Sequence, residues 1–110
     1  MTLTDKTGAP VTVTAEADRF TVGVDGKVVG HADFAERGGQ RVFFHTEVDE
    51  AYGGRGLATL LIAEALAATR TEGKRIVAVC PMVAVYVKKH HDFDDILDRP
   101  TLNILHSLGR

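Results

Sequence analysis

The first half of the chain alternates apolar and polar side chains with a period of two, which is the pattern of half-buried β-strands. Residues 20–24 form the clearest such segment. The pair Asp25-Gly26 follows it, a combination typical of the tight turn between two antiparallel strands. Extended character resumes from Lys27 to Phe34, and the pattern therefore predicts a β-hairpin.

A third strand is predicted at Arg41 to Val48, which is rich in β-branched and aromatic residues. Gly38-Gly39 supplies the turn before it. Val11 to Ala15 shows the same alternation and is predicted to add a short edge strand. The amino-terminal half therefore predicts a largely antiparallel sheet.

The apolar period changes from strand-like to helical after residue 56. Leu57 to Thr71 is dominated by alanine and leucine and has its apolar side chains at helical spacing, so it is predicted to form one long helix. Gly73 stands where a helix C-cap belongs. Ile76 to Val79 is an unbroken apolar run, typical of a strand covered on both faces. Strand, helix and buried strand together predict a right-handed βαβ unit within an α/β (α+β) fold.

The remaining residues predict two further helical segments. Pro81 suits the first turn of a second helix, on which Val83, Tyr86 and Val87 share a face. A short turn is predicted at Asp94 to Leu97. An amphipathic tail is predicted from Pro100 onward, with Leu102, Leu105 and Leu108 as its apolar residues.

Composition and charge narrow the class of protein. With 110 residues, 45% of them hydrophobic, the chain predicts a single domain over residues 1–110. A net charge of −2 with scattered basic residues argues against nucleic-acid binding. The single cysteine forms no internal disulfide, and neither a signal-peptide core nor an apolar run of bilayer length is visible. We therefore expect a cytoplasmic protein with no membrane partner.

A glycine-rich turn, Gly53 to Ala58, lies between the third predicted strand and the long helix. Helix N-termini present N–H groups that lack intrahelical partners, and glycine lets the backbone approach a ligand closely, so this turn suits a pyrophosphate. Arg55 adds a cation. The sequence lacks the Gly-Lys-Ser/Thr of nucleoside triphosphate loops and the acidic residue of dinucleotide sites, which disfavours both ligands. The alternative is a tight turn that binds no ligand.

The turn resembles the phosphate-binding signature of the GNAT acyltransferase superfamily, Arg/Gln-x-x-Gly-x-Gly/Ala at the start of a long helix. Gly54 and Gly56 match its glycines, and Leu57-Ala58 resembles the usual continuation. Ala51 stands where the signature has Arg or Gln. This departure implies that the site depends more on backbone N–H groups and on Arg55.

Four segments in order extend the likeness to the short, single-domain GNAT-like proteins of the YjdJ type: Phe44 to Val48, Gly53 to Ala58, Cys80-Pro81 and Tyr86 to His90. The likeness covers roughly residues 20–97. It implies a GNAT-like fold with a splayed pair of parallel strands and without the amino-terminal helices of full-length domains. Because those helices help to enclose the acceptor in full-length relatives, their absence implies an open or differently built acceptor site.

The resemblance also implies a binding site for acetyl-coenzyme A or coenzyme A. Glu47 and Val48 would hold the pantetheine arm, residues 53–59 the pyrophosphate, and the thioester would end near Cys80. The candidate cofactor residues are Thr46, Glu47, Val48, Gly53, Gly54, Arg55, Gly56, Leu57, Ala58, Thr59, Pro81, Tyr86, Lys89 and His90.

Cys80 and Glu47 are the candidate catalytic residues. Cys80 precedes a proline-started helix, whose dipole favours a thiolate, so it is either a nucleophile or base beside the thioester or a small apolar core residue. Glu47 either orients an incoming amine or holds pantetheine by its backbone. His45 is expected to be structural. No metal site is predicted, because the adjacent His90 and His91 diverge on a helix.

These observations favour an acetyl-coenzyme A-dependent N-acetyltransferase that acts on an unidentified amine acceptor. A coenzyme A-binding module with little or no turnover is the first alternative, and the two hypotheses differ in whether Cys80 is needed for a reaction. A protein-interaction domain without a cofactor is the second alternative. Nothing in the sequence identifies the acceptor, because surface shape rather than periodicity builds an acceptor site.

Overall fold

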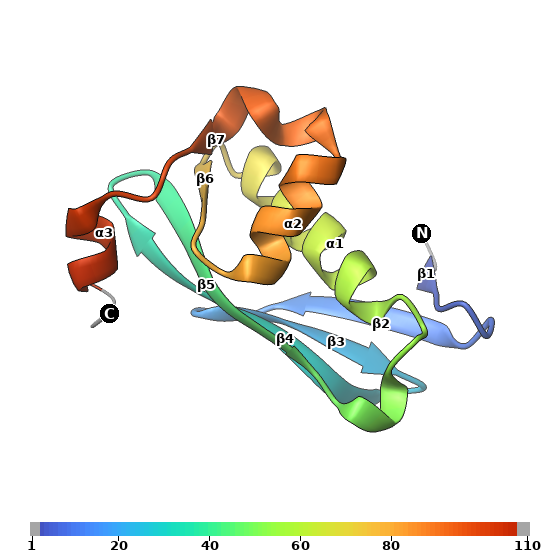
Figure 1. Ribbon diagram of the computed structural model, residues 1–110. Helices are drawn as coiled ribbons and strands as arrows, with labels where there is room; N and C mark the ends of the chain where they lie inside the picture. Colours follow the sequence, from blue (N-terminus) through green and yellow to red (C-terminus); the bar gives the residue numbers. More distant parts are fainter. Residues whose placement is uncertain (1–2, 108–110) are drawn as a thin grey trace.

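The computed structural model describes residues 3–107, which form a curled seven-stranded sheet with helices packed against it (Figure 1). The strands follow one another across the sheet in chain order. The first five pair antiparallel, whereas β6 pairs parallel with β5 and β7 parallel with β6. The strands are β1 (Leu3–Thr4), β2 (Pro10–Ala15), β3 (Arg19–Val24), β4 (Lys27–Arg37), β5 (Gln40–Val48), β6 (Arg75–Ala78) and β7 (Leu97–Asp98).

Two tight turns connect β3, β4 and β5. Asp25 and Gly26 have φ values of 51° and 83°, and Gly38 and Gly39 have values of 50° and 83°. Two successive left-handed residues form a type I′ turn, whose twist matches that of the paired strands. The predicted hairpin and third strand are therefore confirmed. The predicted strand at residues 11–15 is confirmed as β2, but its edge position holds only from Thr12 onward, because the two-residue β1 pairs with Pro10 and Val11.

Three α-helices and two short 3₁₀ segments complete the described fold: α1 (Leu57–Thr71), α2 (Pro81–Lys89), α3 (Leu102–Ser107), η1 (Glu50–Tyr52) and η2 (His91–Ile96). Helix α1 has the predicted bounds and ends at Thr71, and Gly73, with a φ of 72°, follows its C-cap residue Glu72. No α-helix lies in residues 3–56, as the resemblance implied. No helix in the described part of the chain is long and apolar enough to cross a bilayer.

Helices α1 and α2 cover one face of the sheet and form the main core with it (Figure 1). Leu61 and Leu66 of α1 and Ile76 of β6 are fully buried there beside Phe43 of β5. Val83 and Val87 of α2 join the same core, as their shared helical face predicts. This arrangement brings the amino ends of α1 and α2 to the side of the sheet where β5 ends.

Helix α3 covers part of the opposite face. Ile104 is 3% exposed and packs against Val42 and Val77, which alternate with the residues of the main core. The predicted burial of β6 on both faces is therefore confirmed. The expected apolar stripe of the tail was wrong in detail, because Leu102 is 74% exposed and Ile104 takes the buried position; Leu108 lies outside the described residues.

Strands β5 and β6 separate halfway along β5, as the resemblance implied. Their parallel pairing ends at Phe43 and Ala78, whereas β5 continues to Val48. The amides of Val79 and Cys80 both donate to the Phe43 carbonyl, at 2.9 and 2.8 Å, and this is where the chain turns away into α2. A register shift of one residue in the β4–β5 pairing lies at the same place.

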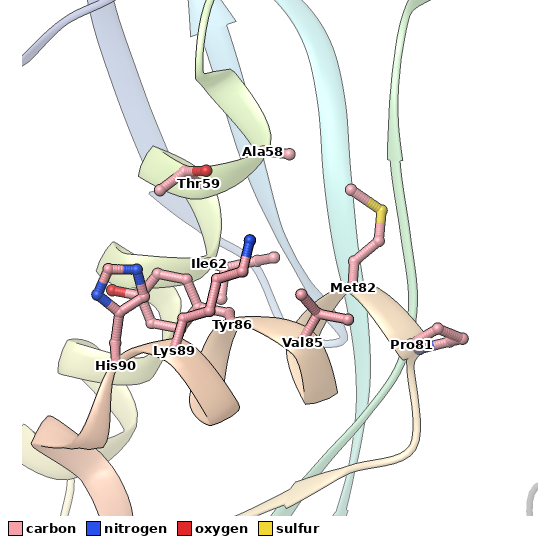
Figure 2. Close-up of a pocket in the computed structure, with 9 residues that line it drawn as sticks. All are labelled: Ala58, Thr59, Ile62, Pro81, Met82, Val85, Tyr86, Lys89 and His90. Atoms are coloured by element: carbon pink, nitrogen blue, oxygen red, sulfur yellow. The ribbon is translucent and has the colours of Figure 1, made fainter.

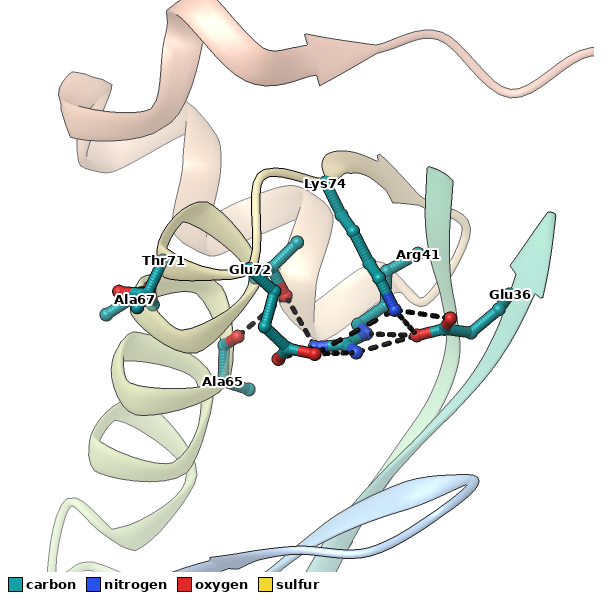
Figure 3. A network of polar contacts seen from close by, with 8 residues as sticks. Glu36, Arg41, Ala65, Ala67, Thr71, Glu72 and Lys74 are labelled. Carbon is teal, nitrogen blue, oxygen red and sulfur yellow. Dashed lines mark hydrogen bonds and ion pairs between the residues drawn. The ribbon is translucent and has the colours of Figure 1, made fainter. Parts of the chain in front are cut away.

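Arg41 fastens the carboxyl end of α1 to the sheet (Figure 3). Its guanidinium is 5% exposed and donates to Glu72 at 2.8 and 3.0 Å and to Glu36 at 2.6 and 3.0 Å. It also lies 4.4 Å from the centroid of the Phe34 ring. Lys74 adds a second cation beside Glu36. The arrangement satisfies a buried charge from both sides, which is the condition under which such a charge is tolerated.

This network predicts loss of stability in acid. Hydrogen bonds from Lys74 and then Arg41 lower the pKa of Glu36, and the hydrogen bond from Arg41 lowers that of Glu72, below the ordinary value of 4.5. A carboxylate whose folded-state pKa is depressed contributes stability above its unfolded-state pKa and loses it as the pH falls through the folded-state value. We expect the urea midpoint to fall below about pH 4.5, and to fall less in the double variant Glu36→Gln/Glu72→Gln. Equal acid slopes in the two proteins would contradict this origin.

Candidate functional site

The glycine turn leads into α1 without a side-chain cap. Gly54 and Gly56 both have a φ of 78°, a left-handed conformation that glycine adopts without strain. Gly56 is the N-cap residue and has no side chain, so it makes no side-chain cap hydrogen bond to the first turn of the helix. A cavity of ≈130 Å³, called here the turn cavity, is lined by Val48, Tyr52, Gly53, Gly54, Gly56, Leu57, Ala58 and Thr59. The amino terminus of α1 therefore faces a small cavity, which favours an anion.

A larger groove lies between α1 and α2 (Figure 2). This interhelical groove has a volume of ≈430 Å³ and is lined by Ala58, Thr59, Ile62, Pro81, Met82, Val85, Tyr86, Lys89 and His90. The predicted cofactor residues after residue 80 all line it, and Ala58 and Thr59 line the turn cavity as well. The two spaces therefore meet at the first turn of α1.

Sequence reasoning missed Ile62, Met82 and Val85 as groove residues. Met82 and Val85 are 40% and 52% exposed, although both are large and apolar. Together with Tyr86 they recur at helical spacing and form a second apolar stripe on α2, beside the buried one. This second stripe was visible in the sequence, because a helix that packs on one face does not need apolar residues on another.

Tyr86, His90 and Lys89 supply the polar groups of the interhelical groove. The rings of Tyr86 and His90 stack with centroids 4.3 Å apart, and the Lys89 side chain extends toward α1 (Figure 2). Burial, with a smaller effect from the charge of Asp92, raises the pKa of Tyr86 above its ordinary value of 10.0. The Tyr86 hydroxyl is therefore protonated at neutral pH and can donate a hydrogen bond.

The free edge of β5 presents main-chain groups of Thr46 and Val48. Val48 stands opposite Gly30 of β4, and the N–H of Asp49 donates to the Val29 carbonyl at 2.7 Å. In an antiparallel ladder this makes Val48 and Gly30 a non-hydrogen-bonded pair, so Glu47 bonds to β4 and its two neighbours point the other way. Thr46 and Val48 thus direct their N–H and C=O groups to the edge that β6 has left.

Cys80 and Thr46 meet where β5 and β6 part. The Cys80 thiol donates to Thr46 Oγ1 at 3.3 Å, and both side chains are buried. Cys80 is 3% exposed and belongs to the main core. It lines neither the turn cavity nor the interhelical groove. The structure thus places the predicted thiol beside the predicted strand, beneath the surface.

The Glu47 side chain lies on the face of β5 opposite to that of Thr46, which contacts Cys80. The two candidate catalytic side chains are therefore not brought together. Its carboxylate is exposed and lies 3.5 Å from His31 and 3.6 Å from His45. It borders a groove of ≈520 Å³ at the ends of β4 and β5, together with Asp49 and Glu50. Within residues 3–107 no group of three His, Cys, Asp or Glu side chains could hold a metal ion.

Arg55 faces away from the turn cavity. Its guanidinium lies 3.4 Å from the buried carboxylate of Asp5 and 4.9 Å from the centroid of the Tyr52 ring. It lines a third groove, of ≈390 Å³, between the segment after β1 and the first turn of α1. The cation expected to face an anion at the turn is thus held by an amino-terminal carboxylate that sequence reasoning did not connect with it.

One protein-family model and two solved structures are similar to this chain. Residues 19–96 match a protein-family model described as GCN5-related N-acetyl-transferase. The fold is similar to the solution structure of a GCN5-like protein from Staphylococcus aureus, with a TM-score of 0.63, 16% identity, and coverage of 86% of this chain and 95% of that one. It is also similar to the crystal structure of an N-acetyltransferase from Staphylococcus aureus Mu50, with a TM-score of 0.50 and 21% identity.

The second structure is the longer protein: the similarity covers 78% of this chain but only 52% of that one. At these identities the two likenesses show the fold alone. None of the curated proteins compared with the chain matches it. The finer likeness to the YjdJ type stays a prediction.

Proposed function

Because the matching family model covers most of the chain, the protein belongs to the GCN5-related N-acetyl-transferase family, and we propose that it transfers an acetyl group from acetyl-coenzyme A to an amine. The observation that carries this proposal is the uncapped amino terminus of α1, which opens on the turn cavity beside the free edge of β5. The turn cavity would take the pyrophosphate of coenzyme A, the free edge of β5 its pantetheine arm, and the interhelical groove its nucleotide part.

The residues present fit a coenzyme A pyrophosphate at the turn. A Cβ built on Gly54 meets no protein atom within 4 Å, so no part of the described chain blocks a ligand at this residue. The first turn of α1 receives no side-chain cap from its N-cap residue Gly56, which leaves its amides available to an anion. The interhelical groove would take the neighbouring part of the molecule, with Lys89 as the charged group and Met82 and Val85 as the apolar wall.

The pantetheine arm carries amide groups, and the free edge of β5 supplies their partners. Thr46 and Val48 would hold the arm by main-chain hydrogen bonds, in the manner of an added strand. This replaces the expected contact from Glu47, whose main chain faces β4. The arm would then lead the thioester toward the point where β5 and β6 part, near Cys80.

Acetyl transfer from a thioester needs a nucleophile and a donor to the developing negative charge. We propose that the amine nitrogen attacks the thioester carbonyl carbon, the C–S bond breaks, coenzyme A leaves as a thiolate and the amine loses a proton. The N–H of Thr46 is the proposed donor to the carbonyl oxygen, because it points to the free edge of β5 and Thr46 lies beside Cys80, where the thioester would end. Tyr86 is a second donor available in the groove, since a phenol with a pKa above 10.0 is protonated at neutral pH.

Replacement of Cys80 tests whether the acetyl group passes directly from the thioester to the amine. A thiol that is 3% exposed and bonded to Thr46 would have to turn out of the core to accept an acetyl group. We therefore expect Cys80→Ala to keep its affinity for acetyl-coenzyme A and to retain turnover to within about tenfold, at a stability cost of about 1 kcal/mol. The measurement is the release of free coenzyme A in the presence of a panel of primary amines.

Two outcomes of that assay would change the proposal. Loss of turnover by more than about a thousandfold in Cys80→Ala, with unchanged binding and an acetyl adduct on the parent protein, would make Cys80 the acyl carrier. Binding of acetyl-coenzyme A without turnover on any amine would favour the alternative of a coenzyme A-binding module.

A further inference from the structure

The short segment between β1 and β2 is fastened to the glycine turn. The Asp5 carboxylate accepts hydrogen bonds from the hydroxyl and N–H groups of Thr7, at 2.6 and 2.8 Å, and from the N–H of Ala9 at 3.0 Å. It also pairs with Arg55, and the N–H of Lys6 donates to the Arg55 carbonyl at 3.0 Å. Side-chain and main-chain contacts therefore fix this segment against the residue between Gly54 and Gly56.

The contacts lay the Lys6 side chain over Gly56. Its Cε, Cγ and Cδ atoms lie 3.3, 3.6 and 3.8 Å from the position that a Cβ on Gly56 would take. The ammonium group is one bond beyond Cε. Lys6 lines the third groove, which shares Gly56 and Thr59 of the α1 amino end with the turn cavity. Lys6 forms no ion pair with any residue in the range 3–107, whereas Arg55 beside it is neutralised by Asp5. The net positive charge at this place therefore belongs to Lys6.

We propose that Lys6 is a binding residue for the coenzyme A pyrophosphate and that the ion pair between Asp5 and Arg55 positions it. This inference rests on the proposed function and assigns a role to a segment that the family match, which begins at residue 19, does not include. Lysine binds phosphate as a compact point charge, so it needs position rather than a fixed fork geometry. Arg55 acts by holding the segment, and Lys6 supplies the charge that the sequence suggested for Arg55.

The test compares two ligands in a calorimetric titration. Lys6→Gln should weaken binding of coenzyme A about tenfold, in keeping with the loss of one charge-assisted hydrogen bond. The same loss is expected with 3′-dephospho-coenzyme A, because that ligand keeps the pyrophosphate. Lys6→Arg should recover most of the affinity. Lys88→Gln is the matched control, because it removes the same charge from an exposed position of α2 that lines no groove of the site.

The results distinguish the role of Lys6 from the proposed function. Binding by the parent with an unchanged dissociation constant in Lys6→Gln would overturn the role of Lys6 and leave the proposed function in place. A loss seen with coenzyme A but not with 3′-dephospho-coenzyme A would move the contact to another phosphate and also overturn it. Absence of binding by the parent protein would overturn both proposals. Lys6 is exposed, so its replacement is expected to leave the melting temperature unchanged.

Discussion

Gly54→Val is expected to remove the stabilisation that acetyl-coenzyme A gives to the protein. Gly54 has a φ of 78°, where a β-branched residue is strained, and its missing side chain leaves room beside the uncapped end of α1. Loss of two charge-assisted hydrogen bonds to phosphate would weaken binding on the order of 100-fold. Ligand at 100 times its dissociation constant stabilises the parent by about 2.7 kcal/mol and would then stabilise the variant by only about 0.4 kcal/mol.

Gly73→Val is the control for this experiment. Gly73 has a φ of 72° at the other end of α1, and a Cβ built there also meets no atom within 4 Å. The two variants therefore carry similar backbone strain, of about 1–2 kcal/mol, and differ in their distance from the turn cavity. Differential scanning fluorimetry with and without ligand should show a full ligand shift for Gly73→Val and almost none for Gly54→Val. Equal shifts would rule out the turn as the phosphate site.

Arg41→Met is expected to destabilise the fold by about 3 kcal/mol, which lowers the melting temperature by roughly 10 °C. The change removes the hydrogen bonds to Glu36 and Glu72 and the contact with the Phe34 ring. It leaves two partly exposed carboxylates that can be hydrated again, so the cost is expected to lie at the low end for a broken buried ion pair. Urea denaturation at neutral pH measures it.

Arg75→Met is the matched comparison for Arg41→Met. Arg75 also binds a carboxylate, that of Asp98, at 2.9 Å, but its side chain is 48% exposed. Exposed ion pairs contribute about 0–1 kcal/mol, so this variant should lose much less stability. Similar losses for the two variants would show that burial of Arg41 does not determine its contribution.

The elements that sequence reasoning predicted best are those specified locally. Leu57 to Thr71 carries its own period and is followed by a glycine that ends the helix, and the observed α1 has the same bounds. The type I′ turns follow from Asp25-Gly26 and Gly38-Gly39 alone. The glycine turn could be predicted for the same reason, because its position between a strand and a helix needs no knowledge of distant residues.

What sequence reasoning could not supply depends on pairing between distant segments. The register shift between β4 and β5 decides that Thr46 faces the helices and Glu47 faces away, and alternation alone cannot give the phase beyond such a bulge. The contact between Arg55 and Asp5 joins residues 50 positions apart. Asp5 directly follows β1, a strand of only two residues. The burial of Ile104 in place of Leu102 depends on which face of the sheet receives α3.

The most direct test of the account is a titration of the ¹⁵N-labelled protein with acetyl-coenzyme A, followed by amide resonances in solution NMR. The largest shifts are expected on Gly54 to Thr59 and on Thr46 and Val48, because these amides would donate to the pyrophosphate and to the arm. The amides of Gly38 and Gly39, at the far end of β5, should not move. Saturating ligand that shifts no amide of the turn, or shifts only residues remote from it, would contradict the account.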